Sequence, residues 1–270
     1  MYLVATPIGN LRDMTLRGLD VLAAADLVLA EDTRVAAKLL NAYGLKARLE
    51  RCDDHASTRG AEVAIERLRE GAVVALVSDA GTPMISDPGF VVARAVIEAG
   101  LPIHPVPGAS ALLSALCVAG LPVDRVTFAG FLPTRSGTRR TALEAMRGDR
   151  QTLVFYESGP RLADSLADMS EVLGPRPAAV ARELTKLYEE CIRGVLPELA
   201  VHPRCQAPKG EIVVVVGPGE AEVASAADAD AALRDALTRL PPGEAAAEVA
   251  RALNLPRKPL YNRALEMRRE

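Results

Sequence analysis

The chain has 270 residues, of which 49% are hydrophobic and 3% aromatic, and its formal net charge at pH 7 is −3. A chain of this length can bury one large core, or two modest cores with a small appendage. The slightly negative charge excludes a uniformly basic nucleic-acid-binding protein but leaves room for local basic patches. No run approaches the roughly 18 consecutive apolar residues of a membrane span, and no signal-peptide pattern precedes the first strand, so we expect a cytoplasmic protein.

The first 120 residues alternate between strand-like and helical patterns. Apolar runs predict strands, and the stretches between them have helical periodicity. Such alternation is typical of a parallel sheet in an α/β protein. The expected strands cover residues 2–6, 27–31, 46–50, 73–78 and 102–106, and the expected helices cover residues 15–25, 33–43, 57–70, 88–99 and 109–119.

A second set of elements follows the break at Gly120-Leu121-Pro122. Its last strands follow one another too closely for every crossover to contain a helix, so the second sheet should be mixed. The expected strands cover residues 126–130, 152–156, 178–182, 188–193 and 211–217, and the expected helices cover residues 138–147, 161–173 and 195–201.

The last part of the chain follows Gly217-Pro218-Gly219 and a linker rich in Ala, Glu and Asp. Three short helices are expected from about residue 228, with breaks at Pro241-Pro242-Gly243 and Asn254-Leu255-Pro256. Their apolar spacing fits a helix-turn-helix, or a three-helix bundle of purely structural use. The expected domains are therefore residues 1–120, 121–219 and 228–270.

Three turn-forming segments follow expected strands of the first sheet, at residues 7–11, 78–83 and 107–111. Parallel strands joined by right-handed crossovers all end at one edge of their sheet, so these loops should line one pocket for a small polar molecule. A tight turn before a helix capped by Asp87, with Pro88 at its first position, is the alternative for the second segment.

Seven segments occur in a recognisable order: VATPIGNLRDMTLR, AEDTR, LVSDAGTPMISDPGF, PVPGASALLSALCVAGLP, FAGFLPTR, ARELTKLYEE and KGEIVVVVG. On these segments the chain resembles the ribosomal RNA small subunit methyltransferase I family of the tetrapyrrole methylase superfamily, over essentially all of residues 1–217. It departs from the family pattern at Cys52-Asp53-Asp54-His55-Ala56, where the family usually has His-Asp-His-Asn, and at Ser158-Gly159-Pro160-Arg161, where it usually has Ser-Pro-His-Arg.

The resemblance implies a two-domain tetrapyrrole-methylase-like α/β fold with a small helical C-terminal domain. It also implies a homodimeric enzyme that uses S-adenosyl-L-methionine to methylate the 2′-hydroxyl of a cytidine in the decoding region of 16S ribosomal RNA, within an assembled 30S subunit. Two alternatives stay open: a tetrapyrrole C-methyltransferase of the precorrin type, and a noncatalytic RNA-binding assembly factor.

The expected cofactor-binding residues come from the three loops of the first sheet and one strand of the second. They are Pro7, Ile8, Asp79, Ala80, Gly81, Thr82, Ser110, Ala111 and Tyr156. NAD is not expected, because no Gly-x-Gly-x-x-Gly follows any strand. The four cysteines have no C-x-x-C spacing and nothing completes a tetrahedral site around His202 and Cys205, so we expect reduced, mostly buried thiols and no metal.

A ribose hydroxyl is a weak nucleophile, so the site needs a proton acceptor or a cation near it. The expected catalytic residues are Glu183 and Lys186, from the RELTK segment, and Asp32. For Asp32, an ion pair with Arg34 that fixes the start of a helix is the commoner use of such a pattern.

Basic residues gather in two places and are candidates for phosphate contacts, although solvated helix faces would give the same pattern. One cluster contains Arg135, Arg139, Arg140, Arg147 and Arg150, and the other contains Arg251, Arg257, Lys258, Arg263, Arg268 and Arg269.

Overall fold

A computed structural model describes residues 1–53, 56–85, 89–219, 226–253 and 255–268. The chain divides into two compact units, residues 1–219 and 220–270. The expected cap at Asp87 and Pro88, and the Asp54-His55 part of the departure from the family pattern, lie outside the described residues. The finer division of the first unit at residue 120 stays a prediction.

The first unit begins with a five-stranded parallel sheet in the order β3-β2-β4-β1-β5. Its strands are β1 (Tyr2–Val4), β2 (Leu27–Ala30), β3 (Leu49–Arg51), β4 (Val74–Val77) and β5 (His104–Val106). The expected α/β order is confirmed. The third strand starts three residues later than expected, because this edge strand pairs only with β2 and its first partner there is Val28, opposite Leu49.

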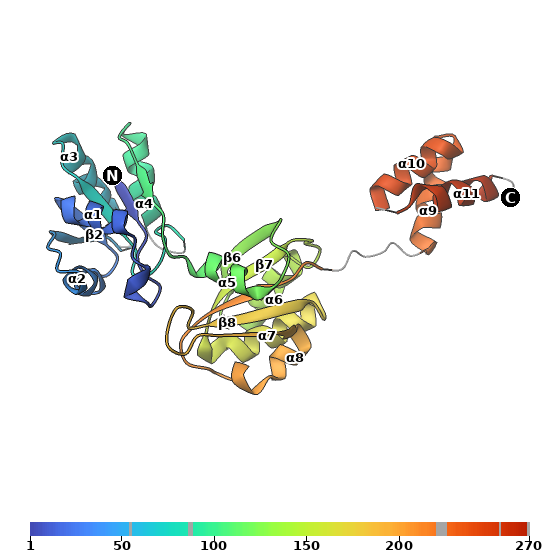
Figure 1. The fold of residues 1–270 in the computed structure, drawn as a ribbon. Coiled ribbons are helices and arrows are strands. Elements are labelled where there is room, and N and C mark those ends of the chain that lie inside the picture. Colours follow the sequence, from blue (N-terminus) through green and yellow to red (C-terminus); the bar gives the residue numbers. More distant parts are fainter. Residues whose placement is uncertain (54–55, 86–88, 220–225, 254, 269–270) are drawn as a thin grey trace. The chain divides into compact units, whose positions relative to one another are not determined.

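Helices cover both faces of this sheet (Figure 1). They are α1 (Leu16–Ala24), α2 (Thr33–Ala42), α3 (Ser57–Arg69) and α4 (Gly89–Glu98), with the 3-10 helix η1 (Leu11–Asp13) before α1. Alternate residues of a strand point to opposite faces. In β2, Leu27 and Leu29 pack with α3 and α4, whereas Val28 and Ala30 pack with α1 and α2. This explains why the central strands read as unbroken apolar runs.

The second sheet has the order β6-β7-β10-β8-β9 and is mixed, as expected. Only β6 and β7 pair in parallel. The strands are β6 (Val126–Phe131), β7 (Thr152–Ser158), β8 (Pro177–Arg182), β9 (Glu190–Val195) and β10 (Glu211–Val216). The helices are α5 (Ala111–Ala119), α6 (Ser136–Ala145), α7 (Gly159–Leu173) and α8 (Leu196–Val201), with the 3-10 helix η2 (Pro203–Cys205).

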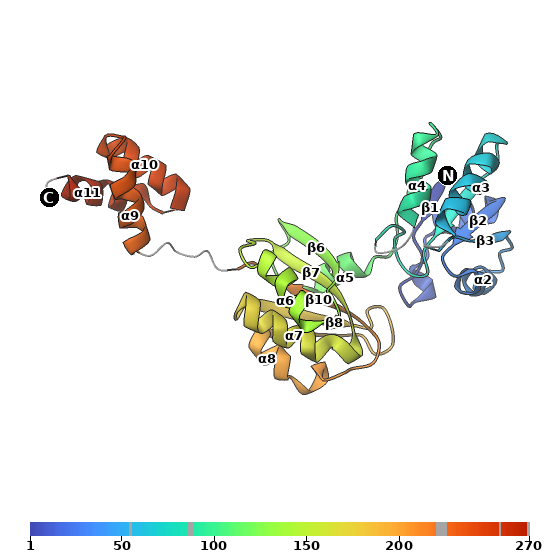
Figure 2. The same ribbon diagram turned by 180° about the vertical axis from the view of Figure 1, so that it is seen from behind.

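Helices α6, α7 and α8 cover one face of the second sheet, and α5 covers the other (Figure 2). Strand β10 is buried on both sides: Val214 and Val216 face α7 and α8, and Val213 and Val215 face α5. Since α5 directly follows β5 of the first sheet, this packing connects the carboxyl edge of the first sheet to the second.

Two features of the first unit correct expectations about which residues are buried and which are exposed. Arg139, expected in a basic patch, is only 4% exposed, and its guanidinium bonds the Asp168 carboxylate at 2.6 Å. That carboxylate also pairs with Arg140, so both arginines join α6 to α7. No disulfide joins the four cysteines, and Cys117, expected among the mostly buried thiols, is exposed. Its helix α5 is so uniformly apolar that the sequence does not reveal which face is buried.

The second unit contains α9 (Ala226–Leu237), α10 (Pro242–Leu253) and α11 (Arg257–Met267). Leu233, Val249 and Leu260 form the centre of its core. Arg263, expected at an RNA surface, instead pairs with Asp230 of α9 at 2.7 Å. This ion pair fixes α11 against α9. None of the described helices is both long and apolar enough to cross a membrane.

Candidate active site

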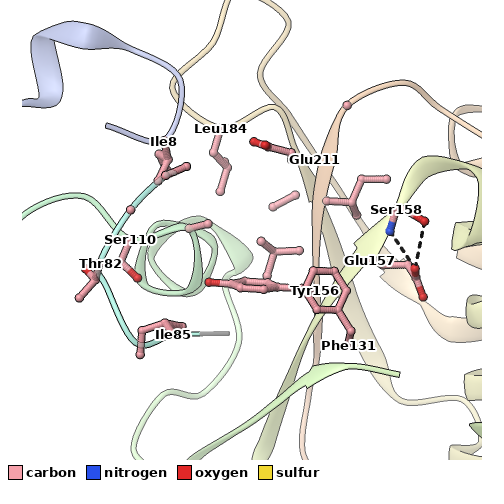
Figure 3. A pocket seen from close by; sticks show the side chains of 17 residues that line it. Ile8, Thr82, Ile85, Ser110, Phe131, Tyr156, Glu157, Ser158, Leu184 and Glu211 are labelled. Carbon is pink, nitrogen blue, oxygen red and sulfur yellow. Dashed lines mark hydrogen bonds between the residues drawn. The ribbon is translucent and has the colours of Figure 1, made fainter. Parts of the chain in front are cut away.

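A cavity of about 320 Å3 lies where the loops of the first sheet meet the second sheet (Figure 3). One wall consists of the loops that follow β1, β4 and β5. It contains Ile8, Ala80, Gly81, Thr82, Ile85, Ser110 and Ala111. The sequence placed three segments at one pocket, and the structure brings residues from all three to this cavity.

Backbone hydrogen bonds hold the first wall. The Thr6 amide donates to the Gly81 carbonyl at 2.9 Å, and the Gly81 amide donates to the Thr6 carbonyl at 3.0 Å. The Thr82 hydroxyl then donates to the Ala109 carbonyl at 3.0 Å, which joins the third loop to the second. Gly81 has φ +82°, and a Cβ there would lie 3.2 Å from Ile8, so glycine satisfies both the turn and the close approach.

The amino end of α5 opens onto the cavity between Ser110 and Tyr156 (Figure 3). The Ser110 hydroxyl caps this helix by accepting from the Leu113 amide, and the Tyr156 hydroxyl accepts from the Leu112 amide. Burial raises the pKa of Tyr156, which keeps the phenol protonated at neutral pH. This end of the cavity is therefore polar but uncharged, and it carries the positive end of the helix dipole.

The opposite wall is built from strands of the second sheet and the loops at their ends. It contains Phe131, Tyr156, Glu157, Ser158, Ala181, Leu184, Gly210, Glu211, Ile212 and Val213. Phe131 is 58% exposed at the rim, and its ring meets Tyr156 edge to face, with centroids 5.6 Å apart. A β-bulge between Phe128 and Gly130 shifts the register of β6, which turns Phe131 toward the cavity.

Glu157 is 3% exposed and is held by three neighbours. Its carboxylate accepts from the Ser158 amide at 2.8 Å and from the Ser165 hydroxyl at 2.6 Å, and Arg161 lies 3.4 Å away. These partners fix the carboxylate at the end of β7. Ser158, where this chain and the family pattern agree, therefore supports this carboxylate through its backbone amide.

Glu183 and Lys186 lie in the loop between β8 and β9, beside the cavity rather than on its lining. The Lys186 ammonium is 2.9 Å from the Glu183 carboxylate and 2.8 Å from that of Glu211. The Glu211 amide also donates to Glu183 at 3.0 Å. Only Glu211 of these three lines the cavity, and it does so from the mouth, with its side chain 73% exposed.

The loop that carries Glu183 and Lys186 has an unusual backbone conformation. Glu183 and Thr185 both have positive φ, at 50° and 67°, which is strained for residues with a side chain. The Lys186 chain lies against Gly9, since a Cβ at Gly9 would be 2.4 Å from Lys186 Cε. Gly9 has φ +150°, a conformation that favours glycine, and its contact with Lys186 joins the TPIGN loop of the first sheet to the charged network of the second.

The charges in this network stabilise one another. The hydrogen bond from Lys186 is the largest cause that lowers the pKa of Glu183. Burial would lower the pKa of Lys186, but hydrogen bonds to Glu211 and Glu183 outweigh it and raise the pKa. Both groups are therefore charged across the neutral range.

Asp32 does not line the cavity. It caps α2, with its carboxylate accepting from the Arg34 amide at 2.8 Å and pairing with the Arg34 guanidinium at 2.5 Å. The Arg34 hydrogen bond strongly lowers the pKa of Asp32, so this carboxylate is a poor proton acceptor. Asp32 therefore fixes the start of α2 through Arg34, which is the alternative that its sequence pattern also allowed.

Seven of the nine expected cofactor-binding residues line the cavity. The other two, Pro7 and Asp79, line a neighbouring cavity. The sequence did not predict Phe131, Glu157, Leu184 and Glu211 as site residues. Three of them lie at ends of strands in the FLPTR, YES and KGE segments, and this position was the available signal. Among the described residues, no group of His, Cys, Asp and Glu could hold a metal ion.

Comparison with known proteins agrees with this architecture. The model of the tetrapyrrole (corrin/porphyrin) methylases matches residues 1–200, and that of the RsmI C-terminal HTH domain matches residues 223–268. A ribosomal RNA small subunit methyltransferase I from Mesorhizobium japonicum is 48% identical over 270 residues, which cover 99% of this chain and 92% of the relative. Another member, from Erythrobacter litoralis, is 48% identical over 268 residues, which cover 99% of this chain and 95% of the relative.

The chain belongs to the ribosomal RNA small subunit methyltransferase I family. Among solved structures, a uroporphyrin-III C-methyl transferase from Thermus thermophilus complexed with S-adenyl homocysteine superposes with a TM-score of 0.54 at 22% identity, covering 80% of this chain and 96% of that chain. This structural similarity shows a shared fold, and it confirms the tetrapyrrole-methylase-like architecture that the sequence predicted.

Proposed function

We propose that the protein transfers a methyl group from S-adenosyl-L-methionine to the 2′-hydroxyl of a cytidine in the decoding region of small-subunit ribosomal RNA. The observation that carries this proposal is the cavity between the two sheets, in a chain 48% identical to ribosomal RNA small subunit methyltransferases. The 22% identity to the uroporphyrin methylase, by contrast, supports a shared fold but not a tetrapyrrole substrate.

The lining of the cavity fits such a methyl donor. Its volume of about 320 Å3 falls within the range of small-molecule sites, roughly 300–1,000 Å3. Apolar side chains such as Ile8 and Leu184 suit the adenine ring and the methylene groups of the donor, and the amino end of α5 at Ser110 and Ala111 suits the carboxylate of the methionine part. Gly81 and Thr82 would hold the donor through close backbone contact.

When bound, S-adenosyl-L-methionine supplies a sulfonium methyl with its own leaving group, so the protein needs mainly to position the acceptor in line with it. The acceptor hydroxyl becomes acidic as its oxygen attacks, and a carboxylate can then accept its proton. Glu211 at the cavity mouth has this role in our proposal. Lys186 keeps Glu211 in place, and Glu183 orients Lys186.

The substrate is proposed to be an assembled small subunit. Arg139 and Arg140 pair with Asp168, and Arg147 lies 3.7 Å from Glu144, so the first basic cluster keeps mainly Arg135 and Arg150 for phosphate contacts. Weak phosphate contacts make recognition depend on the shape of the ribosomal surface. Such a substrate would place the protein in the cytoplasm.

A homodimer is also proposed, because α4 carries exposed apolar residues. Phe90 is 56% exposed and Ile97 is 63% exposed, with Val91 between them at 43%. Apolar side chains gathered on one helix mark a protein interaction surface. Replacement of Phe90 and Ile97 by Asp should give monomers in sedimentation, whereas unchanged sedimentation would contradict this surface.

The second unit is proposed to contact RNA through Arg257 and Lys258 at the start of α11, both of which are exposed. Their joint change to Ala should lower the slope of log affinity against log salt by roughly 0.7–0.9 for each lost phosphate contact. Arg263→Ala should instead lower the melting temperature, because it breaks the pair with Asp230. A double variant with unchanged salt dependence would leave this unit a structural role.

The decisive experiment incubates the protein and labelled methyl donor with assembled small subunits, naked ribosomal RNA and a precorrin. We expect label on a cytidine ribose of the assembled subunits. Label in the macrocycle alone would contradict the proposal, and so would label on a base. Binding of the donor without transfer to any substrate would favour a noncatalytic assembly factor.

A further inference from the structure

A second cavity of about 250 Å3 adjoins the candidate cofactor cavity and has a different lining. Helix α2 supplies Val35 and Leu39, and η1 supplies Leu11, which is 49% exposed. Lys38 and Asp79 add one positive and one negative charge to these apolar walls. A mostly apolar lining with a few polar groups is the usual design of a small-molecule site.

The two cavities are separated by a single layer of backbone. Ile8 lines the cofactor cavity, whereas its neighbours Pro7 and Gly9 line the second one. In the loop after β4, Ala80 lines the first and Asp79 the second. The paired hydrogen bonds between Thr6 and Gly81 hold this layer together. A group bound in the second cavity would therefore lie close to a methyl donor bound in the first cavity.

The charged groups of the second cavity differ in how they are held. The orientation of the Asp79 side chain is fixed by a hydrogen bond, in which one carboxylate oxygen accepts from the Asp32 amide at 3.0 Å. Asp32 is itself held by Arg34, so the start of α2 supports the orientation of Asp79. Lys38 is exposed, and no ion pair within the described part of the chain includes it. Its ammonium can therefore reach a ligand in the cavity.

We propose that this second cavity receives the base of the acceptor nucleotide and identifies it as cytosine through Asp79 and Lys38. The inference rests on the proposed function and deepens it. The pairing edge of cytosine carries an amino donor beside two acceptors, the ring nitrogen and the carbonyl oxygen. The free oxygen of Asp79 accepts from the amino group, and Lys38 donates to the acceptors. The base would leave its stack to enter the cavity.

The same pair of charges rejects uracil. Uracil has a carbonyl oxygen where cytosine has the amino group, so that oxygen would face the Asp79 carboxylate without a proton between them. Its ring nitrogen also carries a proton that Lys38 cannot accept. Mispaired polar groups in a binding site are costly, and they give stronger discrimination than the presence or absence of a methylene group.

The test uses small subunits reconstituted with ribosomal RNA that carries either cytidine or uridine at the target position. The variants are Asp79→Asn, which keeps an oxygen for the Asp32 amide and adds a donor that suits uracil, and Lys38→Met. We expect each variant to lower kcat/KM for cytidine roughly 5- to 100-fold. Asp79→Asn should also reduce the preference for cytidine over uridine by a similar factor.

Two exposed residues of the same first sheet region supply matched controls. Asp20→Asn on α1 and Lys46→Met after α2 make the same chemical changes outside both cavities. Both controls should keep wild-type rates and the wild-type preference. Melting temperature and calorimetric affinity for the methyl donor should stay unchanged in all four variants.

The outcomes separate this inference from the function on which it rests. A wild-type protein that methylates no RNA would overturn the proposed function. If the wild type methylates the cytidine but Asp79→Asn and Lys38→Met behave like their controls, only the cytosine pocket is overturned. Weaker binding of the methyl donor in Asp79→Asn, with an unchanged preference for cytidine, would assign Asp79 to the cofactor and also overturn the inference.

Discussion

The two walls of the candidate cofactor cavity are built in different ways. The wall from the first sheet consists of small residues whose backbone is held by hydrogen bonds, such as those between Thr6 and Gly81. The wall from the second sheet offers larger side chains, including Tyr156 and Glu211, and has the charged network beside it. The difference suggests a division of labour, in which the first wall holds the methyl donor and the second acts on the acceptor.

Crowding the first wall should have the largest effect. Gly81→Val places a branched side chain at φ +82°, where even a Cβ is 3.2 Å from Ile8. We expect calorimetric affinity for the methyl donor to fall about 100-fold, a loss of about 2.8 kcal/mol, because the added side chain displaces the loop that lines the cavity. Gly44→Ala is the control, because Gly44 has φ +67° and open space around it. It should lower stability by about 1 kcal/mol and leave affinity unchanged.

Changing the second wall should instead affect the rate of transfer. Glu211→Gln removes the proposed proton acceptor but keeps its shape, so kcat should fall about 100- to 10,000-fold while affinity for the methyl donor stays unchanged. Glu66→Gln, on the exposed face of α3, is the matched control. A Glu211→Gln protein with wild-type kcat would refute the catalytic role and the division between the walls.

The charged network should also show in the pH dependence of stability. The pKa of Glu183 is lowered from 4.5, so its contribution is present above pH 4.5 and is lost as the pH falls through the folded-state pKa. The pKa of Lys186 is raised from 10.5, so its contribution is present below pH 10.5 and is lost as the pH rises through the folded-state value. Urea unfolding of wild type and Lys186→Met should therefore differ by a constant amount between these limits and converge outside them. A difference that changes between pH 6 and pH 9 would contradict this account.

The smallest effect is expected at Tyr156. Tyr156→Phe removes the hydroxyl that accepts from the Leu112 amide, at a cost of about 0.5–1.5 kcal/mol in stability. Affinity for the methyl donor should change less than threefold, because the aromatic ring still lines the cavity. Tyr261→Phe, in the second unit, is the control. A loss of affinity as large as that of Gly81→Val would show that the second wall also binds the donor.

The sequence by itself determined the order of the elements and the first wall. Strands buried on both faces, such as β2 and β4, appear as short apolar runs, and the turn residues around Gly9 and Gly81 identify the loops that follow β1 and β4. Parallel strands then require these loops to share one edge. The local sequence pattern is enough to predict this wall, because its backbone groups and turns, rather than its side chains, form the binding surface.

Only the tertiary structure decided which polar side chains meet. Glu183 and Glu211 are brought together by the pairing of β8 with β10, and Asp79 and Lys38 by the packing of α2 beside the loop after β4. Arg139 and Arg263 read as surface cations until their carboxylate partners, Asp168 and Asp230, are seen about 30 residues away in the chain. An ion pair depends on distance in space, and a single sequence records only distance along the chain.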